Sequence, residues 1–195
     1  MKAGVEGGSK ELRFTVRKAR PEEIYIVMDI NQRTLPENYW YGFYKFLLDN
    51  WGEAFLVAET SEGDIIGYAM SRVERTRDPV LLGLKSELEN DKSVLSKVID
   101  AIRSQLAEER PVGHLVSIAV LPEYRRKGVG SALLAKTIEV MDRVYNVDAI
   151  YLEVRVSNAP AIRLYEKFGF KKVRVWRGYY RDGEDAYIMV KRLVD

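Results

Sequence analysis

The stretch 117–135, SIAVLPEYRRKGVGSALLA, limits most strongly what this chain can fold into. An apolar strand leads through a proline and a basic loop into a helix start that contains Gly128 and Gly130. The first backbone N–H groups of a helix have no partner within the helix, and the aligned peptide dipoles add partial positive charge there. Because glycine has no Cβ atom, a phosphate can approach this backbone closely. The stretch therefore predicts an anion site, to which the basic loop adds the charges of Arg125, Arg126 and Lys127.

Composition limits the classes of protein. The 195 residues are 47% hydrophobic and 31% charged, as in a soluble globular domain. With 31 Lys and Arg against 29 Asp and Glu, the net charge of +2 argues against a general nucleic-acid binder. The absence of cysteine excludes disulfides, thiolate catalysis and cysteine-ligated metals, and the single histidine, His114, excludes a multi-histidine metal site. We expect no metal.

The sequence contains no pattern that predicts a membrane-spanning segment or a signal peptide. No apolar run is long enough to span a bilayer, so we expect no membrane partner. Residues 1–10 lack the apolar centre of a signal peptide and predict a flexible N-terminal tail. We therefore expect a cytoplasmic protein with one domain over residues 11–195.

The first half of the chain predicts a strand, two helices and a hairpin. Residues 12–17 alternate as a half-buried strand does, and Pro21 with two following carboxylates begins a helix over 21–33. After a break at 34–39, a second helix over 39–50 is rich in aromatic residues. These aromatics either pack in the core or close over an apolar substrate side chain. Residues 54–58 and 64–73 predict the hairpin.

Residues 77–111 predict a helical insertion. Apolar residues recur there at spacings of three and four, which predicts a helix near 92–109 that Pro111 ends. The simpler interpretation is that this helix packs on its own domain, and the alternative is that it binds a partner.

The second half predicts alternating strands and helices. Residues 114–121 are nearly all apolar, as in a central strand covered on both faces. A helix follows the glycines, then a strand over 150–156, and then a helix between the cap Ser157-Asn158 and Gly169. A closing hairpin is predicted over 171–180 and 184–193. The order β-α-α-β-β-insertion-β-α-β-α-β-β indicates one mixed α/β (α+β) domain.

The glycine pattern excludes two common phosphate-binding motifs. The spacing of a P-loop is absent, and Gly128-Val-Gly130 lacks the third glycine of a dinucleotide-binding fingerprint. The segment RRKGVG at 125–130 instead resembles the [Q/R]-x-x-G-x-[G/A] signature of the GNAT superfamily of acetyl-CoA-dependent N-acetyltransferases. The resemblance implies acetyl-CoA as the cofactor. It also implies a mostly antiparallel sheet, splayed between the strands around 114–121 and 149–156, with helices on both faces.

Four further blocks narrow the resemblance. LPENY at 35–39, GHLVSIAV at 113–120, YLEVRVSN at 151–158 and GYYRDGEDAY at 178–187 are similar to the catalytic subunit of NatA-type protein N-terminal acetyltransferases in its archaeal form. The family implies direct transfer of acetyl from acetyl-CoA to the α-amine of protein N-termini that begin with Ser, Ala or Met. It also implies an auxiliary or ribosome-associated subunit as a partner. The long segment 77–111 departs from the family pattern.

The resemblance implies a cofactor site along one strand and the following helix start. The backbone amides from Arg126 to Ser131 would bind the pyrophosphate of CoA. The backbone of the strand at 118–120 would pair with the pantetheine arm, and the N–H of Val120 or a neighbour would polarise the thioester carbonyl. The cofactor-binding residues are thus predicted to be Ile118, Ala119, Val120, Arg125, Arg126, Lys127, Gly128, Val129, Gly130, Ser131, Asn158 and Tyr165.

The catalytic candidates are Glu37, His114 and Tyr165. An α-amine has a pKa near ~7.7–8.0 and a lysine ε-amine one near ~10.4, so an enzyme that acts on the α-amine needs only a mild base. Glu37 and His114 resemble the residues that do this work in the archaeal family, and each would act through an ordered water. Alternatively, Glu37 only positions the substrate and His114 is structural. Some relatives carry a histidine base at the position of Glu153, a route that here would need a carboxylate. Tyr165 either donates a proton to the departing thiolate or only packs in the core.

The substrate site is predicted from two segments. Tyr179 and Tyr180 resemble tyrosines that hold the first backbone atoms of a substrate peptide. Leu35, Pro36, Glu37 and Tyr39 would form the wall around its first side chain, with relaxed specificity. The alternatives are a lysine, ribosomal-protein or small-amine acetyltransferase of the same superfamily, and a non-catalytic acyl-CoA-binding module that docks through 77–111.

Overall fold

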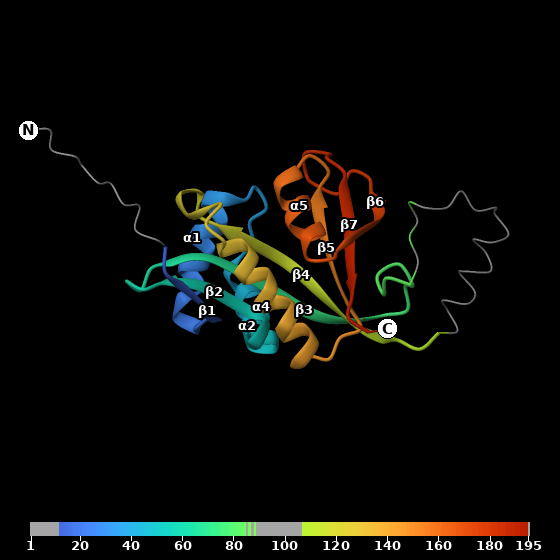
Figure 1. Ribbon diagram of the computed structural model, residues 1–195, viewed down its shortest axis with the longest axis horizontal. Coiled ribbons are helices and arrows are strands. Elements are labelled where there is room, and N and C mark those ends of the chain that lie inside the picture. Colours follow the sequence, from blue (N-terminus) through green and yellow to red (C-terminus); the bar gives the residue numbers. More distant parts are fainter. Residues whose placement is uncertain (1–11, 85, 87, 89–106, 195) are drawn as a thin grey trace, which may run out of the picture.

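The structure, a computed structural model, describes residues 12–84, 86, 88 and 107–194. These residues form one mixed sheet with helices on both faces (Figure 1). The elements in chain order are β1 (Phe14–Lys18), α1 (Ile24–Thr34), α2 (Tyr41–Trp51), β2 (Phe55–Thr60), β3 (Ile65–Thr76), β4 (Arg110–Val120), α4 (Val129–Arg143), β5 (Ala149–Arg155), α5 (Ala159–Lys167), β6 (Lys171–Trp176) and β7 (Ala186–Arg192).

The sheet is open at its centre. Its strand order is β1-β2-β3-β4-β5-β7-β6, and every neighbouring pair is antiparallel except β4 and β5. These two parallel strands pair over a short register that ends at His114 opposite Tyr151. Beyond it they separate, and the molecule divides into two halves along this line (Figure 1). The predicted fold class, with its splay between these strands, is confirmed.

The half that contains β1 to β4 is covered by helices on both faces. The alternation of β2 shows how: Leu56 and Ala58 belong to the core cluster under α4, with Leu133 and Leu134. The neighbouring Phe55 and Val57 belong to the cluster under α1 and α2. Successive side chains of a strand point to opposite faces, so one short apolar strand serves both layers.

The half that contains β5, β7 and β6 has α5 on one face (Figure 1). Its other face is covered by the chain just after β3, where Val80 packs with Tyr151, Ile188 and Val190. The carboxylate of Asp78 also pairs with Arg174 at 3.0 Å. The start of the predicted insertion is therefore part of the core.

Residues 85, 87 and 89–106 of that insertion are not described. The helix predicted near 92–109 lies outside the described residues except at its end, where residues 107–109 are not helical. The prediction that Pro111 ends a helix is wrong, because Pro111 lies inside β4 and is paired with Arg75 of β3. No helix in the described part of the chain is long and apolar enough to cross a membrane.

The closing hairpin has shorter strands than predicted. The strands end at Trp176 and resume at Ala186, so Tyr179 and Tyr180 lie in the connecting loop. Gly178 adopts a left-handed φ of 59°, and its N–H donates to the Asp185 carboxylate at 2.8 Å. The ladder ends with Trp176 opposite Ala186, and the turn follows at Gly178, where glycine adopts the left-handed conformation without strain. The predicted helices over 21–33 and 39–50 and those after Gly128 and Asn158 are confirmed, with ends shifted by a few residues.

Candidate active site

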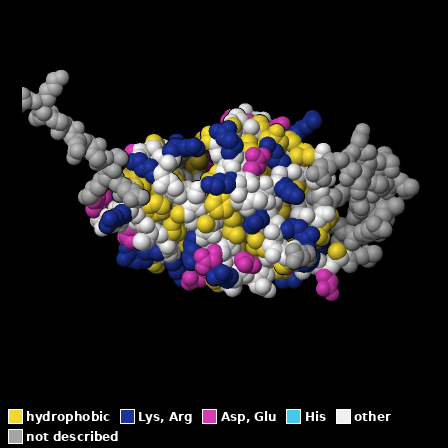
Figure 2. Space-filling model, viewed as in Figure 1, with side chains coloured by type: hydrophobic (Ala, Val, Ile, Leu, Met, Phe, Trp, Pro, Cys, Tyr) yellow, Lys and Arg dark blue, Asp and Glu magenta, His cyan; other side chains and the backbone are white. Residues whose placement is uncertain are grey.

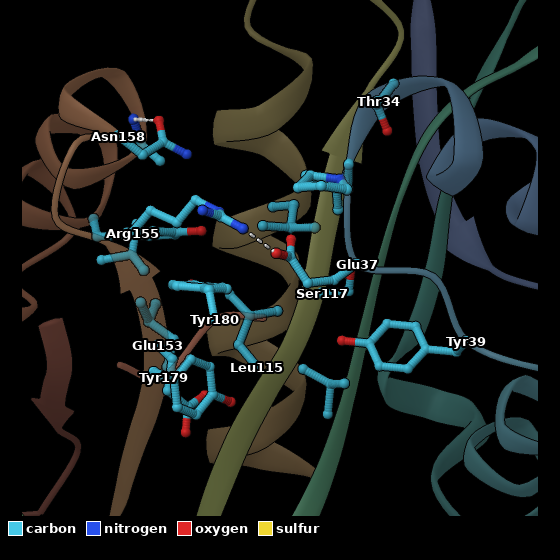
Figure 3. Close-up of a pocket in the computed structure, with 18 residues that line it drawn as sticks. Thr34, Glu37, Tyr39, Leu115, Ser117, Glu153, Arg155, Asn158, Tyr179 and Tyr180 are labelled. Carbon is cyan, nitrogen blue, oxygen red and sulfur yellow. Dashed lines mark hydrogen bonds and ion pairs between the residues drawn. The ribbon is translucent and has the colours of Figure 1, made fainter. Parts of the chain in front are cut away.

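A cleft of about 310 Å³ opens where β4 and β5 separate. One wall comes from the end of α1 and the segment after it, with Thr34, Leu35, Pro36, Glu37 and Tyr39, and another from the loop residues Tyr179 and Tyr180. The floor consists of residues 115–118 of β4 and 152–155 of β5, and α5 contributes Asn158, Ala161 and Tyr165 (Figure 3). The cleft exists because a parallel pair has been forced apart, which leaves backbone polar groups of β4 without a neighbouring strand.

The free edge of β4 carries an irregularity within this cleft. The register with β3 shifts between Met70, opposite Ser117, and Ser71, opposite Leu115. Val116 is therefore the extra residue of a bulge, and it lines the cleft. A bulge changes where the backbone groups of a strand point. Farther along, Ile118, Ala119 and Val120 pair with β3 on one side only.

The predicted phosphate cradle adopts the expected form. Gly128 caps α4 with a φ of 86°, and the N–H of Ala132 donates to its carbonyl at 3.0 Å. The amides just before Ala132 therefore precede the first helical hydrogen bond and are available to an anion. A Cβ at Gly128 would meet no heavy atom within 4 Å, so the approach is open. These features fit the pyrophosphate of CoA.

The cradle joins the cleft through β4. A Cβ at Gly130 would lie 3.8 Å from Val120 and 3.7 Å from Leu164, which places the helix start against the end of β4 and against α5. Arg125 turns back to donate from Nε to the Val120 carbonyl at 3.0 Å, and Lys127 lies 5.6 Å from the centre of the Tyr124 ring. Figure 2 shows Lys and Arg side chains beside the hollow between the two halves.

Glu37 is held by an arginine that the sequence analysis missed. The Nη2 atom of Arg155 lies 2.5 Å from Glu37 Oε1 (Figure 3). Its Nη1 atom bonds Asp182 at 2.7 Å and Glu184 at 2.8 Å, and the guanidinium lies 4.0 Å from the centre of the Tyr180 ring. Burial lowers the pKa of Arg155, but its three carboxylate partners raise it by more. One feature of the sequence could have indicated Arg155: it is a charged residue at the end of a strand in which most other residues are apolar.

His114 lies behind the cleft. It is 8% exposed, and its ring nitrogens face two carboxylates, with Nε2 2.8 Å from Glu153 and Nδ1 3.3 Å from Glu74. Its ring stacks on Tyr151 at 4.3 Å. Burial lowers the pKa of His114, but the hydrogen bonds to Glu153 and Glu74 outweigh it and the net pKa is raised. His114 therefore does not line the cleft itself, but it contacts Glu153, which does.

Glu74, on the neighbouring strand β3, is the second carboxylate that contacts His114. It accepts a hydrogen bond from the Tyr151 hydroxyl at 2.8 Å and pairs with Arg72 at 2.5 Å. The His114 hydrogen bond is the main cause that lowers the pKa of Glu74 to about 2, and Tyr151 and Arg72 add to it. No sequence signal pointed to Glu74, because it comes close only through the pairing of β3 with β4.

Tyr165 lies in α5 and Asn158 is the residue that caps its N-terminus. Burial raises the pKa of the Tyr165 hydroxyl above its ordinary value. The Asn158 side-chain oxygen accepts from the N–H of Ala161 at 3.2 Å, which caps α5. Both residues line the cleft. Asn158 thus has a structural role as the cap of α5, and its contact with the cofactor stays a prediction.

The structure brings nine of the nineteen predicted site residues to the lining of one cleft. Those that line it are Leu35, Pro36, Glu37, Tyr39, Ile118, Asn158, Tyr165, Tyr179 and Tyr180. Those outside the lining are His114, Ala119, Val120, Arg125, Arg126, Lys127, Gly128, Val129, Gly130 and Ser131. Of these, His114 contacts Glu153. Ala119 and Val120 lie at the end of β4, and the remaining residues belong to the loop and the helix start that come after it.

The fold and site define a class of protein. The chain belongs to the acetyltransferase (GNAT) family, whose model matches residues 22–170. It is 46% identical over 180 residues to the N-alpha-acetyltransferase of Saccharolobus solfataricus, a match that covers 92% of this chain and 93% of that one. It is 31% identical over 179 residues to NAA10, the catalytic subunit of the N-terminal acetyltransferase A complex of Arabidopsis thaliana, covering 91% and 77% of the two chains. The structure of Ard1 from Thermoplasma volcanium matches with a TM-score of 0.70 and 26% identity, over 93% of this chain and 99% of that one.

Proposed function

We propose that the protein transfers acetyl from acetyl-CoA directly to the α-amine of protein N-termini. The observation that carries this proposal is a single cleft that combines the free edge of β4 with the Glu37–Arg155 pair and two loop tyrosines. The strand edge suits an extended cofactor arm, and the tyrosine hydroxyls suit the backbone of an extended peptide. The naming of relatives as N-alpha-acetyltransferases supports the same assignment.

Different residues of the cleft would carry out the separate steps of the acetyl transfer. Acetyl-CoA, when bound, supplies a thioester carbonyl and a thiolate leaving group. The cradle would hold the phosphates, and a backbone N–H group at the Val116 bulge or farther along β4, as at Val120, would donate to the developing oxyanion. Glu37 accepts the proton that the α-ammonium must lose before the new N–C bond forms. Tyr165 donates a proton to the sulfur as the C–S bond breaks.

A second carboxylate faces the same cleft. Glu153 is fixed by His114, which is itself fixed by Glu74. The hydrogen bonds to Glu153 and Glu74 raise the pKa of His114, and the 2.8 Å contact with Nε2 holds the Glu153 carboxylate in place at the cleft. In this assignment Glu37 is the base nearer the peptide entrance, and the Glu153–His114 pair is a second proton acceptor that reaches the amine through water.

A lysine side chain, the alternative acceptor, costs more free energy to deprotonate at neutral pH than an α-amine does. Its amine titrates about 2.5 pKa units above an α-amine, and each unit costs about 1.4 kcal/mol to deprotonate at neutral pH. Carboxylates are weak bases and contribute little of that cost. The site therefore suits the more acidic α-amine.

A direct assay tests the proposal. The full chain is incubated with acetyl-CoA and peptides that begin with Ser, Ala or Met, and a peptide with a blocked N-terminus and an internal lysine is the control. We expect α-acetylation of the free peptides alone, and mass spectrometry of fragments locates the acetyl group. Acetylation of the blocked peptide at a similar rate would favour the lysine alternative. Acetyl-CoA should also raise the Tm, since a ligand that binds only the folded state stabilises it.

The NatA-type assignment carries a further expectation of partners. An auxiliary or ribosome-associated subunit would need an apolar surface, and α1 and α2 expose Tyr25, Ile26 and Phe46. With such a subunit the protein would act on nascent chains in the cytoplasm. A stable complex recovered from cell extract with the intact chain, and lost on Tyr25→Ser together with Phe46→Ser, would support this partner. An unchanged complex would contradict the assigned surface.

A further inference from the structure

Aromatic rings lead out of the cleft toward the surface. Tyr180 and Tyr179 line the cleft and their ring centres lie 5.0 Å apart. Trp176, at the end of β6, continues the series with its ring centre 5.0 Å from that of Tyr179. Tyr179 is 40% exposed and Trp176 is 51% exposed. The cleft thus extends into a half-exposed apolar surface formed by Tyr179 and Trp176, here called the aromatic shelf.

The aromatic shelf is held in place by its own loop. Gly178, between the two rings in sequence, turns the chain with its left-handed φ of 59° and donates to Asp185 at 2.8 Å. The N–H of Tyr180 donates to the Glu184 carbonyl at 3.1 Å, and the N–H of Gly183 donates to Tyr180 at 2.8 Å. Arg155 further fixes the loop through Asp182 and Glu184. A surface that is already ordered loses little entropy when it binds a ligand.

Distance relates the aromatic shelf to the substrate peptide. Two steps of 5.0 Å separate Tyr180 from Trp176, so their rings are at most about three extended residues apart, at ~3.3 Å per residue. If the α-amine lies beside Glu37 and Tyr180, the third or fourth residue of the peptide reaches Trp176. The aromatic shelf is continuous with the cleft, and its rings offer no charge to a polar side chain.

We propose that Trp176 determines specificity by binding an apolar side chain at the third or fourth residue of the substrate peptide. This inference rests on the proposed function and adds a requirement beyond the first residue. Trp176 lies outside the residues that line the cleft, so it should affect long peptides and leave the handling of acetyl-CoA unchanged.

Paired peptides test the aromatic shelf. One begins Ser-Ala-Leu-Leu and the other Ser-Ala-Gly-Gly, and both continue with the same hydrophilic tail. Binding to the full chain is measured by calorimetry with CoA present, and KM is measured for acetyl transfer. We expect the leucine peptide to bind roughly tenfold more tightly, as partial burial of an aliphatic side chain predicts. Trp176→Ala should reduce this ratio to about twofold, and Trp176→Phe should retain most of it.

The chain offers a matched control. Trp40 is 74% exposed and is not among the residues that line the cleft, so Trp40→Ala removes an equally large exposed ring elsewhere. This variant should keep the tenfold ratio. An unchanged ratio in Trp176→Ala, or no preference in the parent protein, would overturn the inference. Peptide binding without any acetyl transfer would contradict the proposed function, while the binding ratio would still decide whether Trp176 forms the subsite.

Discussion

Arg155 Nη2 lies 2.5 Å from Glu37 Oε1, and this ion pair joins the segment between α1 and α2 to β5 across the cleft. The other guanidinium nitrogen binds Asp182 and Glu184 in the β6–β7 loop. One side chain therefore fixes the relative positions of three segments that are distant in sequence. The planar fork of arginine suits such a junction, and the point charge of lysine does not.

Replacing Arg155 should impair the peptide side of the reaction. In Arg155→Met, Glu37 loses its partner and the loop that carries Tyr179 and Tyr180 loosens. We expect a lower kcat and a higher KM for peptide, with KM for acetyl-CoA within about twofold of the parent value. Lys45→Met, which breaks an exposed 2.6 Å pair with Asp49 on α2, is the control and should change neither constant. An equal rise in both KM values would instead indicate general loss of structure.

Glu37→Gln tests the assignment of the base. The amide keeps the shape of the side chain and cannot accept a proton. We expect kcat to fall by about 10²-fold, the lower end of what general base catalysis contributes, with little change in either KM. If turnover persists, Glu153→Gln added to the same chain should abolish it. Full activity in the double variant would exclude both carboxylates as bases.

The single histidine makes its protonation directly measurable. Because the sequence contains one histidine, the imidazole carbon and nitrogen signals in NMR belong to His114 alone. We expect a pKa above the ordinary value, since the bonds to Glu153 and Glu74 outweigh burial. Glu74→Gln should lower this pKa. Glu62→Gln, in the exposed β2–β3 turn, removes the same charge far from His114 and should leave its titration unchanged.

The same group should make stability depend on pH. The folded pKa of His114 is raised above its unfolded value of ~6.5, so protonation stabilises the fold fully below that pH. This contribution is lost as the pH rises through the folded pKa. Denaturant unfolding between pH 6 and pH 9 should show the decline in the parent protein, and His114→Gln should flatten it. A parallel decline in the variant would place its origin in another group.

Two glycines with the same backbone conformation separate stability from cofactor binding. Gly128 and Gly63 have φ values of 86° and 94°, and a Cβ at either would meet no heavy atom within 4 Å. Alanine at either position should cost about 1 kcal/mol of unfolding free energy through the left-handed conformation alone. Only Gly128→Ala should also raise KM for acetyl-CoA several-fold, because only Gly128 begins the cradle. Equal effects of the two variants on that KM would contradict the cradle.

The amino-acid sequence by itself determined most of the elements and an anion site, and its resemblance to the GNAT superfamily implied acetyl-CoA. Alternation, helix caps and glycine positions depend on residues a few places apart, so the β4–α4 cradle and the order of elements could be predicted from local patterns. The failures were also instructive. Pro111 was expected to end a helix because nothing local shows that β4 begins before it, and Tyr179 was expected in a strand because nothing local shows where pairing stops.

Only the tertiary structure decided which side chains meet. Glu37 is 118 residues from Arg155, and His114 is 40 residues from Glu74 and 39 from Glu153. These contacts follow from sheet register and from the parting of β4 and β5, which depend on the packing of the whole domain. The sequence shows a carboxylate in a loop and a histidine in a strand, but the fold alone places Arg155 beside Glu37 and two carboxylates beside His114, and those two carboxylates raise the histidine's pKa.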